Sequence, residues 1–151
     1  MDSLSPNLFV TDIRATIEFY KLLGFHIVMS VPGEGEGELV WAMAVCGNVT
    51  IMFQTIQSLG DTLPQITRPQ PASQEPASGA SPELAPHGEV SRGGGAFLLY
   101  IKVKDIRAFF ESIESKVQVI HGLEKTFYGA TEFSIVDNNN FVLTFAEDEG
   151  D

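Results

Sequence analysis

The stretch DIRATIEFY at residues 12–20 returns as DIRAFFESI at residues 105–113, and the first four letters of the two copies are identical. In each copy apolar residues recur at helical spacing behind an aspartate that can cap the first turn of a helix. Strand-like segments flank both copies in the same order. The pattern strand–helix–strand–strand–strand therefore occurs twice, which indicates an internal repeat.

The repeat predicts one helix and four strands in each half. The helices are expected to begin after Asp12 and Asp105, and Gly24 is placed to end the first of them. The strands of the first half are expected at 7–11, 26–31, 39–45 and 49–55. Those of the second half are expected at 97–103, 117–120, 131–136 and 141–145.

Aligning the two halves pairs an aromatic residue in one with an aromatic residue in the other. With one residue dropped at the end of the helix, Trp41 falls on Phe133. Each sheet has a helix available for one face only, so its second face needs other cover. Two such sheets can cover each other.

The segment 58–95 differs from the rest of the chain. It holds six of the eight prolines and no aromatic residue, so it cannot bury enough surface to offset its ordering entropy. We interpret it as a flexible insertion. The expected organisation is a single domain over 1–151, with module one at 4–57, the insertion at 58–95 and module two at 96–148.

Composition excludes several classes of function. The chain has 151 residues and a net charge of −11, which argues against binding to nucleic acid or to an anionic membrane. The single cysteine, Cys46, excludes an internal disulfide and a multi-cysteine metal site. The first residues show no basic and apolar pattern of a signal peptide, so a cytoplasmic protein is expected.

The repeated segments resemble a known family. The stretches that carry the resemblance are SPNLFVTDIRATIEFYKLLGF at 5–25, CGNVTIMFQ at 46–54, LYIKVKDIRAFFESI at 99–113 and YGATEFSIVDNNNFVLTFAED at 128–148. They are similar to the vicinal oxygen chelate superfamily, also called the glyoxalase/bleomycin-resistance/dioxygenase family. The resemblance implies an α+β fold of two tandem βαβββ modules, whose curved mixed sheets enclose a cavity. It also implies a homodimer.

Many members of that family hold a divalent metal at four symmetric positions. Carried over to this chain, those positions are Ser5, Met52, Leu98 and Thr144. None of these side chains is a good ligand for a divalent metal. The sequence therefore resembles the metal-free, bleomycin-resistance-like branch, and no metal or other cofactor is expected.

No other grouping of residues predicts a catalytic centre. His26, His87 and His121 have no ligand spacing, and Cys46 has no histidine near it in sequence that would activate a thiolate. The triple glycine at 93–95 lacks the preceding strand and the lysine of a phosphate-binding loop, so a flexible joint is expected there.

The resemblance also predicts which side chains face the cavity. With alternation along the strands, the side chains expected to face inward are Asn7, Phe9, Met52, Gln54 and Tyr100, and also Ser5, Thr50, Leu98, Lys102, Val142 and Thr144. The predicted ligand-binding residues are Trp41, Phe133, Asn7, Phe9, Met52, Gln54, Tyr100 and Tyr128, with Tyr128 at the rim. The turn holding Glu34, Glu36 and Glu38 is a candidate acidic rim that would attract a cationic ligand.

Three interpretations of function remain open at this stage. The first is a metal-free protein that binds and sequesters a small organic molecule of cationic or aromatic character, such as an antibiotic or metabolite, without turning it over. The second is a metal-dependent lyase, isomerase or dioxygenase with a displaced metal site, for which Gln54, Glu132, Glu147 and the histidines are candidates. The third is a structural or regulatory module whose segment 58–95 recruits a partner.

Overall fold

The computed structural model describes residues 2–60, 97–148 and 150. The elements of the first module are β1 (Asn7–Val10), α1 (Ile13–Leu22), β2 (His26–Pro32), β3 (Leu39–Cys46), β4 (Val49–Thr55) and the short 3-10 helix η1 (Ile56–Leu59). The elements of the second module are β5 (Leu98–Lys102), α2 (Ile106–Ile113), β6 (Gln118–Lys125), β7 (Ala130–Val136) and β8 (Val142–Asp148).

Each module builds one four-stranded mixed sheet, and the two sheets have the same topology. The strand orders are β1-β4-β3-β2 and β5-β8-β7-β6. In both sheets the first strand pairs with the last in parallel, and the other pairings are antiparallel. This confirms the predicted α+β fold of two tandem βαβββ modules.

Both helices begin where the sequence predicted. The carboxylate of Asp12 accepts a hydrogen bond from the backbone N–H of Ala15 at 3.0 Å, and Asp105 accepts one from Ala108 at 3.4 Å. The first helix ends before Gly24, whose φ of +90° lies in the left-handed region that glycine adopts without strain. Local capping chemistry thus fixes the helix boundaries.

The hydrophobic core lies on the helix side of each sheet. In the first module Tyr20 of α1 packs on Phe53 of β4, with ring centroids 4.7 Å apart, and both side chains are fully buried. In the second module Phe109 and Phe110 of α2 pack on Phe133, which stacks on Phe145 at 5.1 Å. The helix faces of both sheets are therefore closed.

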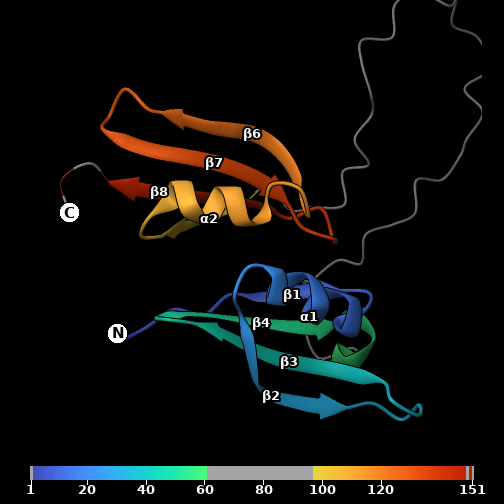
Figure 1. Ribbon diagram of the computed structural model, residues 1–151. Helices are drawn as coiled ribbons and strands as arrows, with labels where there is room; N and C mark the ends of the chain where they lie inside the picture. Colours follow the sequence, from blue (N-terminus) through green and yellow to red (C-terminus); the bar gives the residue numbers. More distant parts are fainter. Residues whose placement is uncertain (1, 61–96, 149, 151) are drawn as a thin grey trace, which may run out of the picture.

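The two modules meet through their helix sides. The hydroxyl of Tyr20 donates to the Asp137 carboxylate, in the turn between β7 and β8, at 3.0 Å. The amide of Asn139 in the same turn donates to Thr16 of α1 at 2.9 Å. Figure 1 shows the two sheets side by side, with α1 and α2 near the seam between them, so neither sheet lies over the second face of the other. Within one chain the sheets do not cover each other.

Several strand boundaries differ from the expected ones. β6 runs on to Lys125, well beyond the predicted end at 120, because Glu124 and Lys125 pair with β7. β8 extends to Asp148 through its pairing with Ala130. These ends depend on partners distant in sequence.

The predicted insertion 58–95 lies almost wholly outside the described residues, as do His87 and the glycines at 93–95. Only residues 58–60 of it are described. Ser58 lies in η1, where its hydroxyl donates to the carbonyl of Thr55 at 2.7 Å. Across the described parts of the chain, no helix has the length and hydropathy needed to cross a membrane.

Candidate functional site

The open face of the first sheet gathers most of the predicted ligand-binding residues. Residues that pair directly across strands share a face, and the pairs here are Asn7 with Met52, and Gln54 with both Phe9 and Trp41. All five side chains are half-buried, whereas their neighbours along the strands are buried beneath α1. The structure therefore brings these predicted residues together on one surface.

Two amides form the polar part of this face. The Asn7 side chain donates to the Gln54 carbonyl oxygen at 2.8 Å, and the Gln54 amide donates in turn to Ser58 at 3.1 Å. The side-chain oxygen of Asn7 is buried and has no hydrogen-bond partner among the described residues.

Strand β2 adds apolar side chains that the sequence analysis did not select. Val31 lies opposite Trp41, and Met29 lies opposite Met43, so all four share the open face. Met29 is 59% exposed and Val31 is 43% exposed. Their position could not be inferred from alternation, because a bulge interrupts the register between Ile27 and Met29.

The open face of the second sheet carries tyrosines and carboxylates. Leu98 and Tyr100 of β5 are about half exposed, and Tyr128 precedes β7. The hydroxyls of Tyr100 and Tyr128 both donate to the carboxylate of Glu132. Lys102 forms an ion pair with Asp148 on the same face. Tyr100 and Tyr128 thus lie together around Glu132.

Phe133 does not belong to this face. Its partner across the strands is Phe145, and only 1% of its surface is exposed beneath α2. Trp41 pairs with Gln54 and Glu132 pairs with Ala146, so the residue structurally equivalent to Trp41 is Glu132. The alignment that paired Trp41 with Phe133 was therefore shifted by one residue along the strand. Such a shift moves a side chain to the opposite face of the sheet.

The four family metal positions hold side chains that do not fit a divalent metal. Thr144 is buried and shares a hydrogen bond of 2.9 Å with Ser134, while Leu98 and Met52 offer no oxygen or nitrogen. Ser5 contributes a single neutral hydroxyl. No three histidine, cysteine, aspartate or glutamate side chains gather as a metal site in the described part of the chain.

The other residues considered for catalysis are engaged elsewhere or lie apart. Both carboxylate oxygens of Glu147 accept backbone N–H groups at the start of α2, from Asp105 at 2.7 Å and Ile106 at 3.2 Å. In the predicted acidic rim, the Glu38 carboxylate accepts a hydrogen bond from a backbone N–H of its own turn. Arg14 of α1 donates a hydrogen bond to a backbone carbonyl of the same turn. These contacts are structural.

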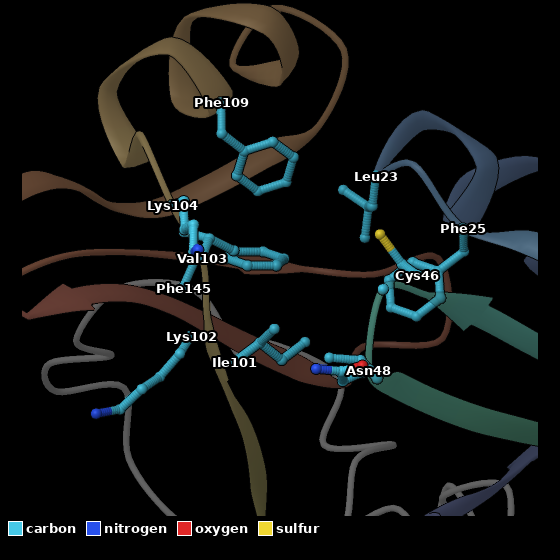
Figure 2. A pocket seen from close by; sticks show the side chains of 12 residues that line it. Leu23, Phe25, Cys46, Asn48, Ile101, Lys102, Val103, Lys104, Phe109 and Phe145 are labelled. Atoms are coloured by element: carbon cyan, nitrogen blue, oxygen red, sulfur yellow. The ribbon is translucent and has the colours of Figure 1, made fainter. Parts of the chain in front are cut away.

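A separate hollow lies at the seam between the modules. It has a volume of about 380 Å³ and lies where the end of α1 approaches β5 and α2. Figure 2 shows Leu23, Phe25 and Cys46 on one side of it and Ile101, Phe109 and Phe145 on the other. None of the predicted ligand-binding residues lines this hollow.

Three tyrosines have shifted pKa values. Burial, together with the neighbouring Asp137, raises the pKa of Tyr20. The hydrogen bond to Glu132 raises the pKa of Tyr100 to about 12 and also raises that of Tyr128. Burial raises the pKa of the Asp137 carboxyl as well, although its hydrogen bonds oppose the shift. Tyr100 and Tyr128 therefore remain neutral hydrogen-bond donors near neutral pH.

Residues 3–145 match the family model of the Glyoxalase/Bleomycin resistance protein/Dioxygenase superfamily. The chain belongs to this superfamily. Membership agrees with the resemblance inferred from the repeated segments and with the two-sheet topology. No curated protein sequence matches this chain.

Solved structures show the same fold at low sequence identity. A protein of unknown function from Agrobacterium tumefaciens is 24% identical, with a TM-score of 0.64 over 97% of this chain and 94% of the other. A bleomycin-binding protein solved with bleomycin is 20% identical, with a TM-score of 0.59 over 99% of this chain and 100% of the other. A bleomycin resistance determinant encoded on transposon Tn5 is 21% identical, with a TM-score of 0.60 over 99% of each chain.

Proposed function

We propose that this protein is a metal-free homodimer that binds and sequesters a small organic molecule without turning it over. The observation that supports it is the pair of open sheet faces, which bear aromatic, thioether and amide side chains but no group of catalytic residues. Trp41, Met52 and the Asn7–Gln54 pair form one face, and Tyr100 with Tyr128 forms part of the other. Mostly apolar walls with a few fixed polar groups are typical of ligand sites.

The arrangement of the modules supports the proposed dimer. Within one chain neither sheet covers the other, so Met29, Val31 and Leu98 remain exposed on the open faces. A second copy can lay its second sheet over the first sheet of this chain, and the reverse, which makes two equivalent cavities. Covering apolar side chains in this way is favourable by about 25 cal/mol per Å².

The bleomycin-binding neighbour supports a small-molecule ligand in general. At 20% identity it does not specify bleomycin or any other antibiotic for this chain. We also propose a cytoplasmic location, which fits a chain with one cysteine.

A metal-dependent enzyme would need the candidates Gln54, Glu132 and Glu147 to converge. Glu147 caps α2, and Gln54 bonds Asn7 and Ser58 on the other module. His26 and His121 also belong to different sheets. Among residues 2–60 and 97–148, no arrangement of side chains favours this function over binding.

Two measurements test the proposal. Elemental analysis of gently purified protein should find no stoichiometric Ni, Mn, Fe, Co or Zn, and these metals should not raise the melting temperature. Trp41 is the single tryptophan, so its emission reports directly on the open face. The dye anilinonaphthalene sulfonate, an anion whose aromatic rings bind apolar surface, should bind this face and quench Trp41 emission by energy transfer.

Matched variants locate the dye. Met52→Ala and Phe9→Ala should weaken binding, whereas Leu22→Ala should not, because Leu22 is an exposed apolar residue on α1. A bound stoichiometric metal would overturn the proposal in favour of an enzyme. Equal binding by all three variants would show that the open face is not the ligand site. A variant that lacks residues 61–96 and still folds tests whether that segment instead recruits a partner.

A further inference from the structure

The second sheet places a carboxylate where the first sheet places its tryptophan. Trp41 and Glu132 occupy equivalent places on β3 and β7, opposite the equivalent residues Gln54 and Ala146. The repeated fold therefore presents a flat aromatic surface on one open face and a negative charge on the other. In a dimer that joins unlike faces, the two would line the same cavity.

Two phenol groups hold this carboxylate in position. Glu132 Oε1 accepts a hydrogen bond from the hydroxyl of Tyr128 at 2.7 Å and a second from Tyr100. Within the described residues, Oε2 has no hydrogen bond and Glu132 forms no ion pair. Tyr100 is 48% exposed and Tyr128 is 58% exposed, so parts of both rings remain accessible beside the charge.

The charges nearby leave negative potential at this place. Glu124 of β6 lies directly opposite Glu132, and like charges in that relation repel each other. The nearest cation along β5, Lys102, is paired with Asp148. Lys125 lies opposite Thr131, on the other face of the sheet from Glu132, and His121 lies further along β6 opposite Ser134.

We infer that Tyr100, Tyr128 and Glu132 form a subsite for the ammonium group of an organic cation. A carboxylate supplies the charge, and a cation beside the faces of aromatic rings gains a further electrostatic attraction from them. A divalent metal fits less well, because neutral phenols and one engaged carboxylate are a poor set of oxygen ligands. This inference rests on the proposed binding function and names the chemical class of its ligand.

The test compares choline with its tert-butyl analogue, in which an uncharged carbon replaces the nitrogen. The two probes have nearly the same shape, so a difference in affinity reports the charge. Amide NMR titration of the full chain should show choline shifting the signals of Tyr100, Tyr128 and Glu132. Choline should bind roughly ten-fold more tightly than the analogue, a ratio that corresponds to about 1.4 kcal/mol.

Glu132→Gln is the decisive variant, because glutamine keeps the acceptor for both tyrosines and removes only the charge. It should abolish the preference for choline, whereas Glu111→Gln, a change of the same kind on the exposed surface of α2, should leave it intact. Tyr128→Leu removes a ring without changing charge and should weaken choline binding several-fold.

The outcomes separate this inference from the function on which it rests. If the protein is dimeric and Phe9→Ala weakens dye binding, but choline and its analogue bind equally, the ammonium subsite alone is refuted. The ammonium subsite is also refuted if the Glu132→Gln variant still binds choline more tightly than the analogue. If the protein is monomeric and no probe depends on the open faces, the proposed function itself fails.

Discussion

Replacing Tyr20 with phenylalanine tests the contact that joins the two modules. The phenyl ring keeps its packing against Phe25 and Phe53, at centroid distances of 5.6 and 4.7 Å, so the variant loses one hydroxyl. That hydroxyl donates to Asp137, whose surface is only 5% exposed. A buried carboxylate oxygen is then left without its donor, which costs about 1–3 kcal/mol.

We therefore expect Tyr20→Phe to lower the free energy of unfolding by about 2 kcal/mol and the melting temperature by roughly 4–8 °C. Urea titrations followed by circular dichroism and by Trp41 emission measure this change. Tyr128→Phe is the matched control, because it removes a hydroxyl at an exposed position and should cost less than about 0.5 kcal/mol. Equal losses in the free energy of unfolding for the two variants would refute the claim that this contact joins the modules.

The pH dependence of the same pair has a defined sign. Burial raises the pKa of Asp137 in the folded chain above its unfolded value, so the folded chain binds this proton more readily. The contribution of Asp137 to stability should therefore fall as the pH rises through the window between the two values. The Tyr20 hydrogen bond favours the charged carboxylate, so the loss in Tyr20→Phe should be largest above that window and shrink below it.

Three further predictions concern other parts of the chain. Glu147→Ala removes the acceptor for two N–H groups at the start of α2 and should cost about 1–2 kcal/mol in denaturant titrations, against less than about 0.5 for Glu111→Ala. Phe133→Ala should cost about 3–5 kcal/mol, because it opens a cavity in the core beneath α2; a smaller loss would place Phe133 outside that core. Met29→Lys should leave the far-ultraviolet circular dichroism unchanged but reduce the measured mass to that of one chain, and a persisting dimer would exclude this face from the interface.

The sequence predicted the local features of the fold well because those features have local causes. Asp12 and Asp105 cap the helices through bonds to residues three positions away, and Gly24 ends a helix through its own backbone angle. Asn7 and Met52 do lie on the open face. Their placement came from the family resemblance, which supplied the starting positions, together with alternation along the strands.

The predictions that were wrong or missing concern features that depend on pairing between residues distant in sequence. Phe133 attracted attention because an aromatic residue aligned with Trp41, but the strand registers differ by one residue and turn Phe133 into the core. The same shift hides the place of Glu132 on the open face, and the pairing of Glu124 with Glu132 across β6 and β7 has no local sequence signal. No local pattern shows that Tyr20 reaches Asp137, a contact across 117 positions that fixes how the modules meet.

The most direct test of the whole account is the mass of the purified protein in solution, measured by light scattering. The uncovered faces of the two sheets predict a particle of twice the chain mass of 16.5 kDa, because the proposed cavity forms only when a second copy covers them. A mass equal to one chain across the working concentration range would contradict the shared cavity on which the proposed function depends.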